Sequence, residues 1–340
     1  MNLKGSVLSP LSASAGRGFF LFSLAKAGEI CYNSLMKCIF LYNPHGGKGK
    51  IVKKLPYIIK KLRRKYETVD VYASRAPEDF THRVREFAAD YDCIVFAGGD
   101  GTFNEILQGI GGMENSPLLG YVPSGTVNDV AHSLGIPRYS LRRALNVVLE
   151  GREERLDCML VNGTRYAMYS VSAGAFTSAS YTTPQKNKRS MGALAYGLEG
   201  MRKNLLFRVF PIHAASADTE LATECVFALI MNGRCVAGLR MNPGGSMNDG
   251  LLEGVVIRQE KNPTLPNRLR ALLTVASLFI FGYRYKQNNI AHFPSGTIRF
   301  EVPDDVVWNF DGERGICGDI EVAVVPRKVR LLVPKKAKRV

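Results

Sequence analysis

The stretch Asp92–Glu105, DCIVFAGGDGTFNE, places residues that could bind a phosphate directly after an apolar run. The run Cys93–Phe96 is typical of a strand buried on both faces of a parallel sheet, and Gly98-Gly99 ends it. Glycines at such a junction let the backbone approach a ligand closely, and the free N–H groups of the helix that follows attract phosphate. Asp100 in the turn would repel a phosphate unless a divalent cation lay between them, which indicates a magnesium-bound nucleotide.

A plain strand-to-helix turn is the alternative interpretation, because glycine-rich turns are common. The spacing of the turn differs from the dinucleotide-binding G-x-G-x-x-G, and no G-x-x-x-x-G-K-[ST] loop occurs in the chain. However, two more polar loops with glycines follow apolar runs, Asn43–Gly49 and Pro123–Asp129. Since open α/β sheets bind ligands at the carboxyl ends of their strands, three such loops favour a phosphate site.

The elements that must position these loops alternate along the first half of the chain. Strand-like runs at 38–42, 68–73, 93–97 and 118–122 are separated by segments with helical periodicity. The helices are expected at 52–64, 77–89, 102–110, 127–134 and 140–149. Such alternation predicts a parallel sheet with helices on both faces.

Beyond about Gly151 the pattern changes to strand-like runs interrupted by two helices, at 190–203 and 267–281. The runs lie at 156–161, 166–172, 225–231, 252–257, 297–302, 306–310 and 320–325. This pattern predicts an antiparallel sandwich or barrel. The second helix is too short to span a bilayer, so we expect it to be buried against the β domain, with a lipid-facing role as the alternative.

The composition is that of a folded two-domain protein, with 340 residues of which 46% are hydrophobic. Seven cysteines without a C-x-x-C pair fit a reducing compartment, and five histidines without ligand spacing make a zinc site improbable. Residues 1–35 differ from the rest and contain only a short apolar run, so we expect an extension outside the folded domains. Translation that begins at Met36 is a simple account of it.

The net charge of +15 is concentrated in two acid-free stretches, Lys48–Lys65 with nine Lys and Arg residues and Arg327–Arg339 with seven. The first stretch has apolar residues on one helical face, and Pro56 should kink or restart this helix. A basic amphipathic helix is a candidate for an anionic membrane surface. A solvated face above an ordinary core contact is the alternative.

Five motifs in order resemble the diacylglycerol kinase catalytic family, and within it the small bacterial lipid kinases. They are Asn43-Pro44 with its glycine loop, Gly98–Glu105, Pro123–Asp129, Asp249-Gly-Leu251 and Asp311-Gly-Glu313. The resemblance covers Met36 to about Pro334, with a modest departure at Gly46, where the family usually has Ser or Ala.

The resemblance implies an α/β nucleotide-binding domain at 36–155 and a β-sandwich lipid-substrate domain at 156–325, with the active site in the cleft between them. Residues 326–340 would be a basic tail. Glu313 would accept the proton, with Asp311 beside it organising charge and metal. Asp249, with backbone oxygens near Ser246 and Leu251, would match the structural Mg²⁺ site of the family, and Asp100 would face the Mg²⁺ that comes with the nucleotide. ATP would be held by Asn43, Pro44, His45, Gly46, Gly47, Ser74, Gly98, Gly99, Asp100, Gly101, Thr102, Phe103, Asn104, Glu105 and Thr126.

The implied function is an ATP-dependent kinase for a membrane-lipid hydroxyl, with diacylglycerol as the first choice of acceptor. A carboxylate must take the proton of such a poor nucleophile while Mg²⁺ and backbone N–H groups stabilise the charge. We expect a cytoplasmic enzyme at an anionic membrane surface, with no nucleic-acid partner. A homodimer is an open alternative, as are an NAD kinase-like phosphotransferase and a non-catalytic nucleotide-binding regulator.

Overall fold

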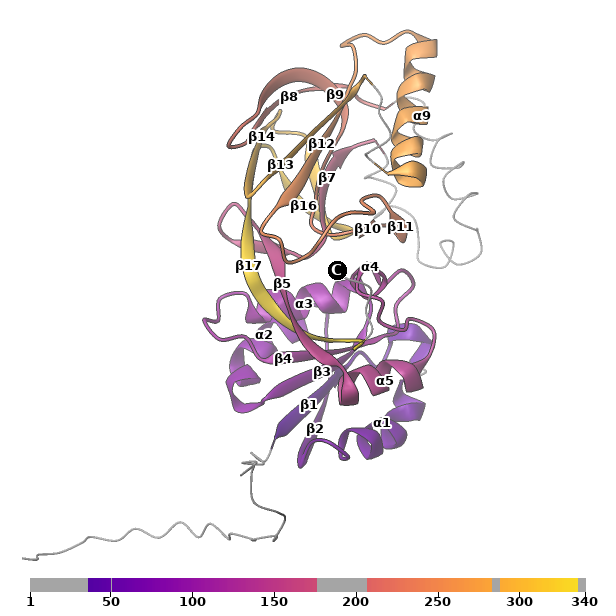
Figure 1. Cartoon of the computed structure of the whole chain (residues 1–340), viewed down its shortest axis with the longest axis vertical. Helices are drawn as coiled ribbons and strands as arrows, with labels where there is room; N and C mark the ends of the chain where they lie inside the picture. Colours follow the sequence, from indigo (N-terminus) through magenta and orange to yellow (C-terminus); the bar gives the residue numbers. More distant parts are fainter. Residues whose placement is uncertain (1–35, 50, 176–206, 283–287, 336–340) are drawn as a thin grey trace, which may run out of the picture. The chain divides into compact units, whose positions relative to one another are not determined.

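The structure, a computed structural model, describes residues 36–49, 51–175, 207–282 and 288–335, which all belong to one compact unit of the chain, residues 35–340. Its first half alternates strands with helices, as predicted (Figure 1). The elements are β1 (Lys37–Tyr42), η1 (Gly46–Gly49), η2 (Val52–Lys54), α1 (Leu55–Leu62), β2 (Thr68–Ala73), α2 (Asp79–Phe87), η3 (Ala88–Asp90), β3 (Cys93–Gly98), α3 (Asp100–Ile110), β4 (Leu118–Pro123), α4 (Asp129–Ser133) and α5 (Leu141–Glu150).

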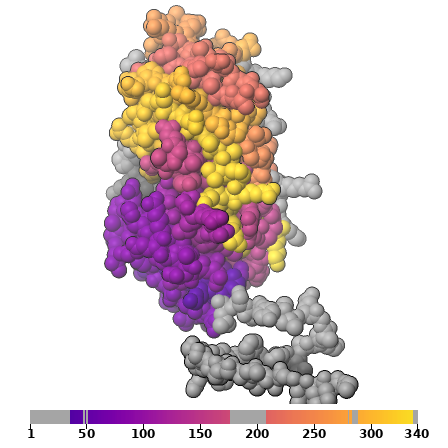
Figure 2. Space-filling model, turned by 90° about the vertical axis from the view of Figure 1, so that its left-hand side faces the viewer, coloured from indigo at the N-terminus to yellow at the C-terminus, as the bar shows by residue number. Residues whose placement is uncertain are grey.

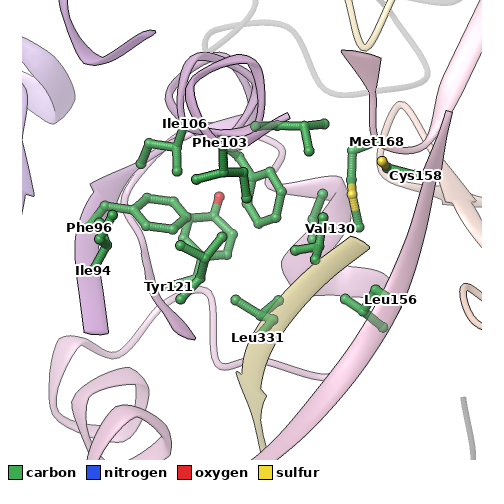
Figure 3. Packing of buried hydrophobic residues seen from close by; sticks show 14 of the residues in the cluster. Ile94, Phe96, Phe103, Ile106, Tyr121, Val130, Leu156, Cys158, Met168 and Leu331 are labelled. Carbon is green, nitrogen blue, oxygen red and sulfur yellow. The ribbon is translucent and has the colours of Figure 1, made fainter. Parts of the chain in front are cut away.

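The four strands of this half form a parallel sheet in the order β2-β1-β3-β4. All six residues of β3 are buried, which confirms a strand covered on both faces. Alternate side chains of the sheet serve two cores. On one face Phe40 and Val95 lie in a cluster with α1 and α5, and on the other Phe96 packs against Phe103 of α3 and Tyr121 (Figure 3).

Pro56 restarts the helix as predicted. The 3₁₀ turn η2 ends at Lys54, and α1 begins at Leu55 with Pro56 in its first turn. That position is compatible with proline because the first N–H groups of a helix have no partner within the helix.

The second half consists of strands and one described helix, and the predicted helix at 190–203 lies outside the described residues. The strands at 210–215, 235–236, 239–240, 290–295 and 313–317 were not predicted. The elements are β5 (Arg152–Val161), β6 (Arg165–Ala167), β7 (Ser170–Gly174), β8 (Phe210–Ala215), β9 (Glu220–Met231), β10 (Cys235–Val236), β11 (Leu239–Arg240), β12 (Leu252–Arg258), α9 (Leu265–Phe281), β13 (Ile290–Ser295), β14 (Thr297–Glu301), β15 (Val307–Phe310), β16 (Glu313–Cys317) and β17 (Ile320–Val333).

Strand pairing in the second half is antiparallel, along the path β16-β15-β7-β9-β8-β14-β17. These strands enclose a core of their own around Trp308, which stacks on Phe300 with ring centroids 5.6 Å apart. The indole N–H of Trp308 donates to the Gly318 carbonyl over 2.7 Å, so its one polar group is satisfied. The predicted fold class, a parallel α/β half followed by an antiparallel β half, is confirmed.

The last strand, β17, joins the two halves. It pairs with β14 and β5 in the antiparallel sense, and near its end with β4 in the parallel sense. Figure 2 shows the yellow C-terminal residues bordering purple residues of the first half on one face. The segment expected as a basic tail therefore begins inside a strand, and residues 336–340 lie outside the described residues.

The helix α9 buries one face and exposes the other. Leu272, Val275 and Leu278 belong to a core cluster with β9 and β12, whereas Leu269 and Leu273 are about half exposed. The expected burial against the β domain thus holds for one face only. None of the described helices combines the length and apolar character that a membrane span requires.

Candidate active site

The loop after β1 is ordered by Asn43. Its side-chain oxygen accepts hydrogen bonds from the N–H groups of His45, over 2.8 Å, and Gly46, over 3.1 Å. Such local bonding of Asn to the backbone closes a tight turn. The Ser74 N–H donates to the Tyr42 carbonyl over 3.0 Å, which places Ser74 beside the end of β1. These predicted site residues therefore lie at the carboxyl edge of the parallel sheet.

The glycine turn after β3 contacts the loop after β4 backbone to backbone. A Cβ on Gly125 would lie 2.5 Å from the Cα of Gly99, and a Cβ on Gly98 would lie 2.3 Å from the Thr102 side chain. Only glycine permits these approaches. Thr126 is exposed on the same loop. The turn and the loop thus form one continuous backbone surface at the start of α3.

Asp100 holds that surface together. Its two carboxylate oxygens accept from the N–H groups of Asn128, over 2.8 Å, and Asp129, over 2.7 Å. Burial raises the pKa of Asp100 to about 6, against the lowering effect of these backbone donors. The carboxylate therefore orders the neighbouring loop whether or not it also approaches a metal ion.

Two residues of the GGDGTFNE stretch direct their side chains away from the turn. Phe103 is buried in the core beneath α3 (Figure 3). A carboxylate oxygen of Glu105 accepts from the Phe80 N–H over 3.3 Å, at the N-terminal end of α2. Burial raises the pKa of Glu105. The side chains of these two residues therefore support the packing of α3 rather than line the turn.

Asp311 lies in the turn between β15 and β16 and is 4% exposed. Its carboxylate accepts from the N–H groups of Met168, Tyr169 and Ser170 over 2.6 to 3.0 Å, and from the Asn104 side-chain amide over 3.0 Å. Burial raises its pKa, and these four donors oppose the rise. A buried carboxylate with four donors is fixed in position.

Glu313 is exposed at the first position of β16, two residues after Asp311. A Cβ placed on Gly101 would lie 3.7 Å from its Oε1. The exposed carboxylate of Glu313 therefore lies beside the glycine turn at the start of α3. The fold brings Gly101 and Asn104 of α3 together with Asp311 and Glu313, which lie more than 200 residues further along the chain.

The predicted metal loop, residues 246–251, is held by the buried Asp157. The Asp157 carboxylate accepts from the Gly250 N–H over 2.8 Å and from the Arg327 N–H over 2.7 Å. Asp249 is exposed, and one of its oxygens accepts from the Leu251 N–H over 3.1 Å. Burial of part of the carboxyl group raises its pKa.

Within the described residues no three His, Cys, Asp or Glu side chains gather as a metal site. The loop instead offers one carboxylate together with backbone carbonyls and the Ser246 hydroxyl, which donates to the side-chain oxygen of Asn248 over 2.6 Å. Such an all-oxygen set fits Mg²⁺, which keeps several waters and takes one or two carboxylates.

Two family models match consecutive parts of the chain. Residues 37–161 match the diacylglycerol kinase catalytic domain, and residues 169–333 match the YegS C-terminal NAD kinase beta sandwich-like domain. The chain belongs to the diacylglycerol kinase family of lipid kinases. It is an enzyme of the phosphotransferase class.

Relatives named diacylglycerol kinase agree with this membership. A diacylglycerol kinase of Bacillus subtilis (strain 168) is 28% identical over 298 residues, 87% of this chain and 96% of the relative. One from Staphylococcus saprophyticus is 29% identical over 277 residues, 81% of this chain and 88% of the relative. The fold is that of a Bacillus anthracis diacylglycerol kinase crystal structure, with a TM-score of 0.71 at 19% identity over 89% of this chain and 98% of the other.

In this lipid kinase the structure adds residues that sequence reasoning did not select. Gln108 donates from its side-chain amide to the Asn104 side-chain oxygen, over 3.1 Å, and to the Tyr166 carbonyl, over 2.6 Å. Its own side-chain oxygen accepts from the Tyr166 N–H over 3.1 Å. Gln108 thereby fixes the amide of Asn104 with its NH₂ group toward Asp311. Its position one helical turn after Asn104 was the only signal in the sequence.

Asn128 and Asp129 end the loop Pro123–Asp129, which was named from the sequence without a role for these two residues. The Asn128 oxygen accepts from the Tyr121 hydroxyl and the Gly125 N–H, each over 3.1 Å, and its φ of 57° is left-handed. Asp129 accepts from the Gly238 N–H over 2.6 Å, which joins α4 to the β10–β11 turn. Burial, with the nearby Asp100 charge, raises the pKa of Asp129 to about 7.

Proposed function

We propose that this lipid kinase transfers the γ-phosphoryl group of ATP to the hydroxyl of diacylglycerol, which gives phosphatidic acid. The observation that carries the proposal is the exposed Glu313 carboxylate beside Gly101, at the start of α3. A general base next to a phosphate-binding turn is what transfer to an alcohol requires. The names of the relatives support diacylglycerol as the acceptor.

ATP would bind along the carboxyl edge of the parallel sheet. The N–H groups at the start of α3 favour anionic phosphate, and the close contact of Gly99 with Gly125 leaves backbone exposed for it. The residues expected to surround ATP at this edge are Asn43–Gly47, Ser74, the turn from Gly98 and Thr126. Phe103 and Glu105 would support the turn from within the fold, because their side chains point away from it.

Glu313 would take the hydroxyl proton as the acceptor oxygen forms its bond to the γ-phosphorus. The bond from that phosphorus to the bridging oxygen breaks at the same time, and ADP leaves with the electron pair. Asp311 would hold the turn that presents Glu313, because its own carboxylate is buried and already accepts four hydrogen bonds.

Mg²⁺, when bound, would neutralise charge on the transferred phosphoryl group. Asp100 would face this ion, and the carboxylate of Asp249, with the carbonyls and hydroxyl around Ser246 and Leu251, would hold a separate, structural Mg²⁺. Asp157 would keep the loop of Asp249 in place through Gly250.

The two halves of the chain divide the work in this proposal. Residues 36–155 would bind the nucleotide and residues 156–325 the lipid, with the acceptor entering the cleft between them. The enzyme would act on the cytoplasmic side of a membrane and touch its anionic surface reversibly, without a nucleic-acid partner. A lipid acceptor stays in the bilayer, and basic surface attracts anionic headgroups.

Incubation with γ-labelled ATP and Mg²⁺ tests the proposal, with diacylglycerol in mixed micelles as one acceptor and NAD as the other. The second acceptor is included because the C-terminal half matches a domain described as NAD kinase beta sandwich-like. We expect label in phosphatidic acid. Label in NADP alone would mean that the acceptor is NAD and not a lipid.

A further inference from the structure

Asn232 directly follows β9 and is only 1% exposed. Its side-chain amide donates to the Asp157 carbonyl over 2.9 Å and to the Met168 carbonyl over 3.0 Å. Its backbone N–H donates to the Tyr169 carbonyl over 3.0 Å. Because two carbonyls accept from the side chain, its NH₂ group must face them, which fixes the orientation of the amide. Asn232 therefore binds the carbonyls of two consecutive residues, Met168 and Tyr169.

The same two residues bind Asp311 from the opposite side. The Tyr169 N–H shares a peptide group with the Met168 carbonyl, and it donates to the Asp311 carboxylate over 2.9 Å. The Ser170 N–H shares the next peptide group with the Tyr169 carbonyl, and it donates to the same carboxylate oxygen over 3.0 Å. The C=O and N–H of a trans peptide group point in opposite directions. Each of the two peptide groups is therefore held between Asn232 and Asp311.

Burial makes the side-chain bond to Met168 important. Met168 is 1% exposed, so bulk water does not replace Asn232 at its carbonyl. A buried carbonyl without a donor is costly, and a peptide group that lost its donor would turn toward another one. Such a rotation would move the Tyr169 N–H away from Asp311. Hydrogen bonds in a chain also polarise one another, which strengthens the bonds to the buried carboxylate.

Asp157 supplies a fixed point at the other end of the Asn232 side chain. It lies in β5 and is 1% exposed. Its carboxylate accepts from the backbone N–H groups of Gly250 and Arg327, which leaves its carbonyl to Asn232. Through Asn232, the turn that presents Glu313 is thereby connected to β5.

We propose that Asn232 is a positioning residue for the kinase reaction. It would hold the two peptide groups that fix Asp311, and Asp311 in turn would set Glu313 beside Gly101. This role rests on the proposed function, in which Glu313 takes the hydroxyl proton. A base must lie within hydrogen-bond reach of that proton, and a displacement of about 1 Å can lower the rate by roughly 10²-fold.

A double-mutant cycle in the full-length protein tests this role. It compares the wild type with Asn232→Ala, Glu313→Gln and the variant that carries both substitutions, with ATP and diacylglycerol in mixed micelles. The matched control is Thr274→Val in α9. Thr274 is 2% exposed and donates its hydroxyl to the Arg270 carbonyl over 3.0 Å, so the control also removes a buried hydrogen bond of the β half.

We expect Asn232→Ala to lower kcat by roughly 10- to 100-fold with little change in the KM for ATP. In the Glu313→Gln background the same substitution should lower kcat by no more than about twofold, because the base that it positions is already absent. Equal losses in both backgrounds would show a general structural effect and overturn the proposal. An unchanged kcat, a rise in the KM for ATP alone, or an equal loss in Thr274→Val would overturn it as well.

Amide hydrogen exchange of residues 311–317 tests the positioning without catalysis. We expect faster exchange in Asn232→Ala than in the wild type, with no change in Thr274→Val, and an unchanged rate in Asn232→Ala would overturn the proposal. If the wild type phosphorylates no diacylglycerol while the exchange changes as expected, the proposed function fails and the link from Asn232 to the turn stands. If Asn232→Ala does not fold by circular dichroism, Asn232→Ser takes its place with the same expectations, because its hydroxyl can donate to only one of the two carbonyls at a time.

Discussion

Asn104 donates a hydrogen bond from its side-chain amide to the carboxylate of Asp311 over 3.0 Å, across 207 residues of sequence. The bond links α3, which begins at the glycine turn, to the β15–β16 turn, which presents Glu313. Gln108 orients the amide by binding the backbone of Tyr166. This polar contact therefore links α3 to the turn that carries the proposed base.

Asn104→Ala should lower the free energy of unfolding by about 1.5–3 kcal/mol, because it removes a hydrogen bond to a buried charged group. We also expect kcat to fall more than the KM for ATP rises, since the amide contacts Asp311. Urea unfolding and steady-state kinetics measure both. The exposed Asn146→Ala is the matched control, and a change in the KM for ATP alone would assign Asn104 to the nucleotide instead.

Asp129→Asn should change the pH dependence of stability. The pKa of Asp129 is about 7 in the folded protein and 3.8 in the reference state, so ionisation costs more in the folded protein. Proton binding by Asp129 contributes fully to the free energy of unfolding below about pH 4, and this contribution is lost as the pH rises toward 7. The variant, which cannot ionise, should gain stability relative to the wild type over this range, by on the order of a few kcal/mol. Urea unfolding in EDTA at several pH values measures the difference, and a constant difference would mean that Asp129 is not protonated in this range.

Asp249→Asn should raise the Mg²⁺ concentration needed for half-maximal activity, because an amide is a weaker ligand for a hard cation than a carboxylate. Activity should recover in part at high Mg²⁺. Asp218→Asn, at an exposed turn, is the control. An activation curve identical to that of the wild type would remove Asp249 from the metal site.

The parallel sheet and its loops could be predicted because the signals are local. Four apolar runs, three of them followed by a polar loop with glycine, define strands whose carboxyl ends share one edge. Pro56 indicated a helix restart from a similarly local signal, because an α-helix accommodates proline only in its first turn. The residues of the GGDGTFNE stretch could be placed at that edge, but not the direction of each side chain. The bond from Phe80 to Glu105 depends on how α2 packs beside α3.

Contacts between distant segments could not be predicted. The four donors of Asp311 come from β7, the residues before it and α3, and no spacing in the sequence relates them. β17 was expected to end at Val325, because the charges from Arg327 onward were interpreted as a tail. In the structure a register shift between Val325 and Val329 lets the strand continue, and Arg330 pairs with Glu153 over 2.8 Å.

The most direct measurement of the central claim is the turnover of Glu313→Gln with diacylglycerol, at saturating ATP and Mg²⁺. The substitution keeps the shape of the side chain and removes its basic oxygen, so kcat should fall by roughly 10²- to 10⁴-fold while ATP binding by calorimetry stays near the wild-type value. Glu150→Gln, at an exposed helix end, should behave as the wild type. Near wild-type turnover by Glu313→Gln would contradict the account, because the carboxylate beside the glycine turn would then not be the group that takes the proton.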